Sequence, residues 1–142
     1  MVTCEVCVEG FSGAWAAAQG GAHRIELCAG LLEGGTTPSM GGIALAVERL
    51  EIPIMVLIRP RGGDFLYSGA ELDTILRDIS LAGEMGAAGV VTGALTRDGD
   101  VDEEIMGRIG DAAGSMSLTF HRAFDMVRDP AASLETLIGL DV

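Results

Sequence analysis

A run of five apolar residues places the strongest constraint on how this chain can fold. Residues 54–58, with the sequence Ile-Met-Val-Leu-Ile, follow Pro53 and contain no polar side chain. Such a short run predicts a strand that is covered on both faces, as in a parallel sheet flanked by helices. Residues 59–64, Arg-Pro-Arg-Gly-Gly-Asp, place charges and two glycines after the carboxyl end of that strand. Ligands bind at this edge of α/β sheets. We therefore expect a ligand-binding turn here, and the alternative is a surface turn with solvated charges.

The rest of the chain alternates between strand patterns and helix patterns. Polar and apolar side chains alternate strictly in residues 24–28, which predicts a strand. Residues 68–85 repeat apolar side chains at helical spacing, and Ser68 with Glu71 matches a capping box. We expect strands at residues 3–8, 24–28, 54–58, 89–92 and 118–121, and the start of a sixth at residues 140–142. We expect helices at residues 11–19, 39–50, 68–85, 101–113 and 130–138, with N-caps at Ser12, Ser39, Ser68 and Asp129.

This alternation predicts an α/β fold with a parallel sheet, because right-handed β-α-β connections join parallel strands. Charged residues follow several of the strands, as they do at the carboxyl edge of a TIM-like (β/α)8 barrel. A complete barrel takes roughly 250 residues, whereas these 142 residues hold only about five βα units. We therefore expect residues 1–142 to form a single partial barrel domain without its C-terminal units. A complete open sheet is the alternative.

The charge balance excludes several classes of function. The net charge is −12, with nine arginines and no lysine, so we expect no binding to nucleic acid or to an anionic membrane surface, both of which need a basic face. The absence of lysine excludes Schiff-base chemistry and a P-loop. No glycine-rich nucleotide fingerprint and no membrane-length apolar run occur, so we expect no nucleotide cofactor and no membrane span. Three cysteines without a signal peptide suggest reduced thiols in the cytoplasm.

Polar side chains fall on one face of each predicted strand. Because alternate residues of a strand share a face, the apolar residues of each strand should meet the helices and the polar ones should point into the barrel. The predicted inward set consists of Glu5, Cys7, Arg24, Glu26, Cys28, Thr119 and His121, and Arg59 and Arg61 share a parity at the end of their strand. Buried charges must be paired or serve a ligand. The pattern therefore predicts either a functional pocket or a set of charges that neutralise one another.

Cys7 and Cys28 fall on neighbouring strands with the same parity. Adjacent strands lie about 4.8 Å apart, so two thiolates at these positions could hold a soft ion of low coordination number such as Cu(I). Two buried, inert thiols are the alternative, since free cysteine is often found in cores. Cys4 lies on the opposite face from Cys7, so we do not expect these two to act together. No compact ligand set for zinc is present.

A second group of residues suggests an enzyme that acts on a small anionic substrate. In this hypothesis Arg59 and Arg61 bind a phosphate or carboxylate group, while Glu26 or His121 transfers a proton. Asp125 follows His121 closely and completes the candidate pocket. A histidine that is bonded to an interior carboxylate is the structural alternative for His121. A purely structural role, in which the polar interior only specifies packing, is also open.

Taken together, these segments resemble the CutC copper homeostasis family. The matching segments are residues 5–8, 20–28, 33–39, 58–65, 91–95 and 119–126. They span nearly the whole chain, and jointly they are highly specific although each is weak alone. The sequence departs from the family at His23, where the family usually has aspartate.

The resemblance implies a barrel related to the TIM fold in a cytoplasmic protein that is a homo-oligomer when full length. It also implies a role in copper tolerance, with a copper ion as partner, and it assigns Cu(I) binding to Cys7 and Cys28. The family extends beyond this chain by about three βα units. Its polar barrel mouth resembles that of an enzyme, so a small anionic ligand is the second partner that we expect.

Overall fold

The computed structural model describes residues 2–142 and contains one parallel sheet of five strands. The strands are β1 (Glu5–Glu9), β2 (Arg24–Cys28), β3 (Ile54–Leu57), β4 (Gly89–Thr92) and β5 (Ser117–Phe120). The helices are α1 (Gly10–Gln19), α2 (Met40–Arg49), α3 (Gly69–Glu84), α4 (Glu103–Ala113) and α5 (Pro130–Gly139), with short 3₁₀ helices η1 (Leu31–Glu33) and η2 (Arg122–Met126). The strand order in the sheet, β1-β2-β3-β4-β5, follows the chain. The predicted α/β class and parallel sheet are confirmed.

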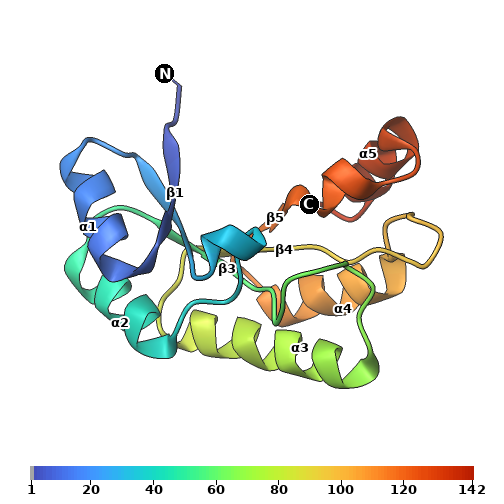
Figure 1. The fold of residues 1–142 in the computed structure, drawn as a ribbon, viewed down its shortest axis with the longest axis horizontal. Coiled ribbons are helices and arrows are strands. Elements are labelled where there is room, and N and C mark those ends of the chain that lie inside the picture. The colour runs from blue at the N-terminus through green and yellow to red at the C-terminus, as the bar shows by residue number, and fades with distance from the viewer. Residues whose placement is uncertain (1) are drawn as a thin grey trace.

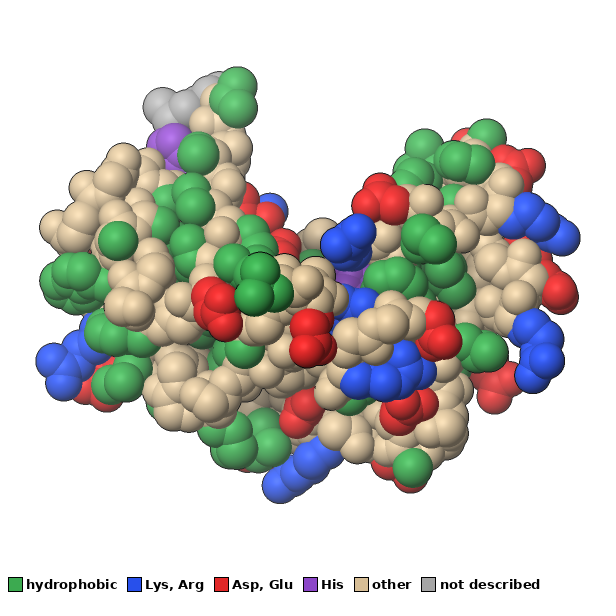
Figure 2. All heavy atoms as spheres, viewed as in Figure 1, with side chains coloured by type: hydrophobic (Ala, Val, Ile, Leu, Met, Phe, Trp, Pro, Cys, Tyr) green, Lys and Arg blue, Asp and Glu red, His purple; other side chains and the backbone are tan. Residues whose placement is uncertain are grey.

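The helices lie along one side of the sheet and leave its other side open. Figure 1 shows α1, α2, α3 and α4 following one another around the outside, from the blue end of the chain to the orange part. Figure 2 shows the molecule hollowed between the part that carries β1 and the part that carries α5. This arrangement is that of consecutive units of a (β/α) barrel. No helix within residues 2–142 is long and apolar enough to cross a membrane.

The main core lies between the sheet and the helices. Ile25, Leu27, Val56 and Val90 are fully buried on the helix-facing side of the strands. The helices contribute buried side chains at helical spacing: Ile43, Ala46, Leu72, Ile75, Ile79, Met106 and Ile109. Each fully buried large side chain of this kind stabilises the fold by roughly 1.5–3 kcal/mol. Because one set of alternating residues in each strand packs against the helices, the other set lies on the concave face of the sheet.

Strands β3 and β4 are buried on both faces, as the apolar run predicts. All four residues of each strand are buried. On the concave face a smaller apolar cluster forms from Cys28, Met55, Leu57 and Val91. The concave face is therefore apolar at its centre, and its polar side chains lie on β1, β2 and β5.

Side-chain caps fix where most of the helices begin. Ser68 accepts a hydrogen bond from the amide of Glu71, whose carboxylate accepts one from the amide of Ser68, so the predicted capping box is present. Ser39 and Asp129 cap α2 and α5 as predicted. Asp102 caps α4, which places the start of this helix two residues after the predicted one.

The predicted cap at Ser12 is wrong. Helix α1 begins at Gly10, and Glu9 occupies the N-cap position without a side-chain hydrogen bond. Gly10 has φ +67°, a left-handed conformation that glycine adopts without a steric penalty. The chain therefore turns from β1 directly into α1, and Ser12 already lies inside the helix.

The predicted start of a sixth strand at residues 140–142 is also wrong. The amide of Leu140 donates to the carbonyl of Thr136 at 3.1 Å, and the amide of Val142 donates to the carbonyl of Leu137 at 3.1 Å. Asp141 has φ +59°, in the left-handed region. These residues therefore close the C-terminal end of α5, in the way that a left-handed residue often ends a helix.

Candidate functional site

The cysteine pair lies on the concave face of β1 and β2. Cys7 is opposite Glu26 in the parallel register, and Cys28 is opposite Glu9. The two sulfur atoms are 3.9 Å apart. The Cys7 thiol also donates to Oε1 of Glu26 at 3.2 Å, and the Cys28 thiol donates to the carbonyl of Val8 at 3.3 Å. The structure thus brings together the three inward side chains Cys7, Glu26 and Cys28.

Both thiols hold their protons firmly. Burial raises the pKa of Cys7, and the hydrogen bond and the negative charge of Glu26 raise it further. Burial also raises the pKa of Cys28, and burial raises the pKa of Glu26. A metal ion that binds to both sulfurs must therefore displace two protons, because the thiolate is the ligand form.

The donor set fits an ion of low coordination number. A metal–sulfur bond is about 2.3 Å long in zinc sites, so two such bonds span at most about 4.6 Å. The separation of 3.9 Å between the sulfurs leaves room for one ion between them. Thiolates are soft ligands that favour Cu(I). No group of three or more histidine, cysteine, aspartate or glutamate side chains that could hold a metal occurs within residues 2–142.

Two inward charges near the amino ends of the strands neutralise each other. Arg24 on β2 donates to the carboxylate of Glu5 on β1, its partner in the register. Cys4 lies at the start of this region as an exposed free thiol, and its amide donates to Nδ1 of His23 at 2.9 Å. The alternative of mutual neutralisation therefore applies to Glu5 and Arg24, and His23 has a structural contact.

Arg59 is buried at the carboxyl end of the sheet, where it holds the surrounding loops. Its side chain is only 3% exposed. The guanidinium donates to the carbonyls of Glu33 at 3.1 Å, Gly35 at 3.0 Å and Gly63 at 2.7 Å, and it lies 4.7 Å from the centre of the Phe65 ring. Nε has no hydrogen-bond partner among the described residues. Arg59 thus ties the loop after β2 to the loop after β3.

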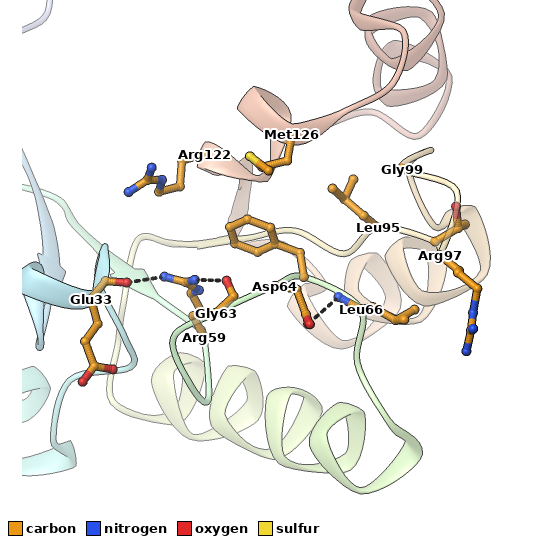
Figure 3. A pocket seen from close by; sticks show the side chains of 12 residues that line it. Glu33, Arg59, Gly63, Asp64, Leu66, Leu95, Arg97, Gly99, Arg122 and Met126 are labelled. Atoms are coloured by element: carbon orange, nitrogen blue, oxygen red, sulfur yellow. Dashed lines mark hydrogen bonds between the residues drawn. The ribbon is translucent and has the colours of Figure 1, made fainter.

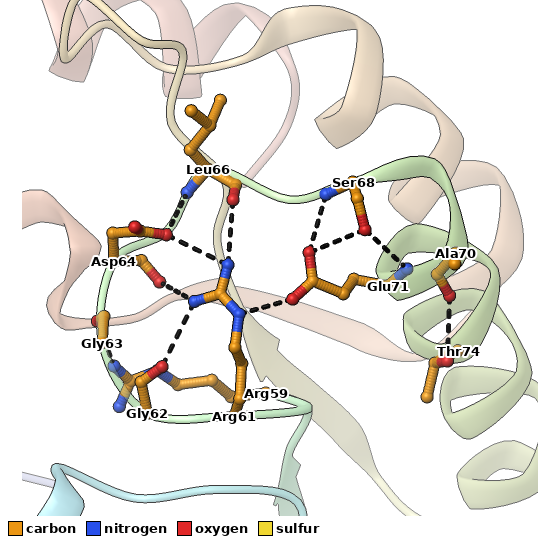
Figure 4. A network of polar contacts seen from close by, with 10 residues as sticks. All are labelled: Arg59, Arg61, Gly62, Gly63, Asp64, Leu66, Ser68, Ala70, Glu71 and Thr74. Atoms are coloured by element: carbon orange, nitrogen blue, oxygen red, sulfur yellow. Dashed lines mark hydrogen bonds and ion pairs between the residues drawn. The ribbon is translucent and has the colours of Figure 1, made fainter.

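Arg61 turns away from Arg59 toward the beginning of α3. It forms ion pairs with Glu71 and with Asp64, the latter at 3.0 Å, and it donates to the carbonyl of Leu66 at 3.0 Å (Figure 4). The hydrogen bond from Arg61 lowers the pKa of Glu71 to about 2, with help from Ser68. Arg61 lines neither of the cavities described below. Arg59 and Arg61 were expected to point the same way because they are two residues apart. Their guanidinium groups point in different directions, because β3 ends at Leu57 and both arginines lie in the turn after it.

His121 lies just after β5 and is buried, with 8% of its surface exposed. Its Nδ1 accepts a hydrogen bond from the amide of Ala123 at 3.4 Å, whereas Nε2 has no partner within residues 2–142. Burial lowers the pKa of His121 to about 3, and the positive charges of Arg59 and Arg122 lower it further. The ring is therefore neutral at physiological pH.

Two cavities adjoin these residues. The larger, about 580 Å³, lies among the loops at the carboxyl end of the sheet, and Figure 3 shows Arg59, Arg97 and Arg122 around it. The smaller, about 350 Å³, lies on the concave face and is lined by Cys7, Glu26, Gly34, Leu57, Val91, Thr119, Phe120, His121 and Arg122. The smaller cavity therefore lies between Cys7 and His121, and Arg122 lines both cavities.

Sequence reasoning included Asp125 and left out Arg122. Asp125 is exposed on η2 and lines neither cavity. The Arg122 side chain is exposed and forms no ion pair with any other described residue, and its guanidinium lies close to Gly34. The sequence offered one indication for Arg122, because it comes directly after His121 at the carboxyl end of a predicted strand.

Comparison with known proteins gives one consistent result. The model of the CutC family matches residues 2–142. The copper homeostasis protein cutC homolog of Homo sapiens is 54% identical over 136 residues, which is 96% of this chain and 50% of the human protein. A CutC family protein of Mesorhizobium japonicum is 52% identical over 138 residues, or 97% of this chain and 54% of that protein. The chain spans about half the length of the curated relatives that it matches.

A solved structure agrees with these relatives. The crystal structure of the CutC protein of Streptococcus agalactiae superposes with a TM-score of 0.92 at 35% sequence identity. The match covers 99% of this chain and 69% of that protein. The five βα units described above are therefore arranged as they are in that structure.

Proposed function

This chain belongs to the CutC family, and we propose that it serves in copper homeostasis by binding Cu(I) between Cys7 and Cys28. The names of its human and mouse relatives support the link to copper. The cysteine pair supports the binding mode, because two soft sulfur donors face each other and two thiolates suffice for a low-coordinate Cu(I) ion. We propose a cytoplasmic location as well, since Cys4, Cys7 and Cys28 are free thiols and the cytosol keeps thiols reduced.

The distance of 3.9 Å between the two sulfurs is the observation that carries this proposal. It arises from the parallel register, which sets Cys7 beside Glu26 and leaves Cys28 one step further along the same face. Cys28 is fully buried, whereas Cys7 is exposed. An ion would therefore approach from the side of Cys7 and reach Cys28 behind it.

An anaerobic titration with Cu(I) against a competing chelator tests the proposal. We expect one ion to bind per chain, and we expect Cys7→Ser and Cys28→Ser each to abolish this binding, because one thiolate alone cannot hold the ion against the chelator. Cys4→Ser is the matched control: it removes a thiol of the same strand region that lies outside the pair, so binding should persist. Equal affinity in the Cys7→Ser, Cys28→Ser double variant would refute the proposal, provided that circular dichroism shows all variants to be folded.

An enzyme that acts on a small anionic substrate is the second candidate function. The observation that favours it is the cavity of about 580 Å³ at the carboxyl end of the sheet, which is lined by three arginines. Active sites of TIM-like barrels lie at this end, and guanidinium groups suit phosphate and carboxylate. A screen of phosphorylated and carboxylated metabolites for turnover tests it. A screen without any converted metabolite would count against this candidate and would leave the copper proposal untouched.

A further inference from the structure

We propose that Arg122 and the Nε2–H group of His121 form a binding site for a small oxyanion, the phosphate or carboxylate group of a metabolite, on the concave face of the sheet. The inference deepens the enzymatic candidate, on which it rests for the kind of ligand, and it does not involve copper. It replaces the expected pair Arg59 and Arg61, because the structure commits both of these to contacts within the protein.

His121 supplies a hydrogen-bond donor that has no acceptor. Because Nδ1 accepts the amide proton of Ala123, the proton of the neutral ring lies on Nε2. That Nε2 is buried and has no partner in the described part of the chain. An unsatisfied buried donor destabilises the folded state, and such groups in native proteins require an explanation. An anionic oxygen in the adjoining cavity would accept this hydrogen bond.

Arg122 supplies a cation that forms no ion pair with any described residue. A Cβ atom placed on Gly34 would lie 2.8 Å from Nη1 of Arg122 and 3.3 Å from Nη1 of Arg59, so the two guanidinium groups approach the same glycine. Arg59 donates only to backbone carbonyls, and the Glu33 carboxylate points away from it in Figure 3. No carboxylate forms an ion pair with Arg59 or Arg122 within residues 2–142.

This local excess of positive charge stands out in a chain with a net charge of −12. Five of the other arginines form ion pairs: Arg24, Arg49, Arg61, Arg77 and Arg128. The charges of Arg59 and Arg122 both act on His121. The two guanidinium groups therefore lie near the His121 ring, whose Nε2–H group has no acceptor among the described residues. A fixed N–H group and a guanidinium fork are the usual means of binding phosphate or carboxylate.

His121 and Arg122 both line the smaller cavity, which has space for a ligand. His121 and Arg122 line one side of it, with Thr119 on β5. Glu26 is the one carboxyl group among the lining residues, and it is engaged with the Cys7 thiol at 3.2 Å. The anionic group of a ligand would therefore lie toward β5, and the remainder of the ligand would extend toward β2.

Binding of inorganic phosphate and of acetate to the metal-free protein tests the site. Isothermal titration calorimetry at constant ionic strength compares the wild type with Arg122→Gln and with Arg108→Gln, which removes the same charge from the exposed face of α4. We expect Arg122→Gln to weaken binding about tenfold or more and Arg108→Gln to leave it unchanged. Preference for phosphate or for acetate identifies the anion class. Absence of binding for both anions, or equal binding by wild type and Arg122→Gln, would overturn the proposal.

The role of His121 has its own readout. In ¹⁵N–¹H spectra of the imidazole groups, we expect the Nε2 signal of His121 to shift when the anion is added to the wild type. In Arg122→Gln the same shift should require about tenfold more anion. An unchanged signal in a wild-type protein that binds the anion would exclude His121 from the site.

These experiments measure binding and not turnover. Anion binding without any metabolite turnover would therefore support the site and count against the enzymatic candidate. Arg122→Gln should still bind Cu(I), which separates the inference from the copper proposal.

Discussion

At the scale of single residues, three arginines near the carboxyl end of the sheet do three different things. Arg59 holds two loops together through backbone carbonyls, Arg61 joins the loop after β3 to α3, and Arg122 has no partner among the described residues. The sequence predicted a cationic edge at this place, and that edge exists. It could not predict which guanidinium remains available, because the choice of partner depends on how the glycine-containing turn after β3 directs each side chain.

His121 should make the stability of the fold depend on pH. Its pKa is about 3 in the folded protein, below the ordinary value of about 6.5. Between these values the unfolded chain binds a proton that the folded protein does not, so stability falls as the pH falls, by up to about 1.4 kcal/mol per pH unit. We expect acidification from pH 7 to pH 5.5 to cost the wild type about 1 kcal/mol more than it costs His121→Asn, as measured by urea denaturation.

The exposed His23 provides the control for this prediction. His23→Gln should keep the pH dependence of the wild type, because His121 is still present. If His121→Asn and the wild type lost the same stability on acidification, the buried neutral histidine would not be the cause. The groups that act on His121 are the charges of Arg59 and Arg122, and both stay positive over this range of pH.

At the scale of secondary structure, elements that carry a clear pattern in neighbouring residues were predicted well. The strict alternation of residues 24–28 predicted β2 and the face of each of its side chains, and the predicted and observed limits agree. The capping box at Ser68 predicted the start of α3. The errors at Ser12 and at residues 140–142 have another cause. In both places a left-handed residue, Gly10 or Asp141, sets the path of the chain, and it carries no strong pattern.

The capping box at α3 gives a prediction for this helix. Ser68→Ala removes the acceptor for the amide of Glu71 and should cost about 1 kcal/mol, or roughly 4 °C in the melting temperature of a chain of this size. Ser80→Ala is the control, because Ser80 is half-buried in the C-terminal part of the same helix, far from the cap. The substitution removes only the hydrogen bond from Ser80 to the exposed Glu84, and alanine is the better helix former there. Thermal unfolding followed by circular dichroism measures both. A loss of the same size in Ser80→Ala would show that the cap is not the cause.

At the scale of the whole molecule, the sheet has a well-covered centre and two outer strands. β3 and β4 have neighbours on both sides and are buried throughout, whereas β1 and β5 each pair with one strand among the described residues. The burial of β1 and β5 is only partial. Parallel sheets gain most of their stability from coverage on both faces, so the centre of the sheet should be its most stable part.

Hydrogen exchange measured by NMR or mass spectrometry checks this difference. We expect the amides of β3 and β4 to exchange slowest, near the rate set by global unfolding, and those of β1 and β5 to exchange faster by local opening. The amides inside α3 serve as the internal reference. Equally slow exchange in β5 and β3 would contradict the prediction and would mean that the outer strands are covered, as they would be by a second copy of the chain in a homo-oligomer.

The strand order has one more consequence, which concerns the time at which the protein is made. Each strand pairs with the strand that precedes it in the chain, so every βα unit that leaves the ribosome finds its neighbour already present. Folding can therefore proceed vectorially from the amino terminus, with contacts that span little more than one unit. Cys7 and Cys28 belong to the first two strands. The cysteine pair is thus the first part of the concave face that a growing chain can assemble, well before the loop that carries His121 and Arg122 has been synthesised.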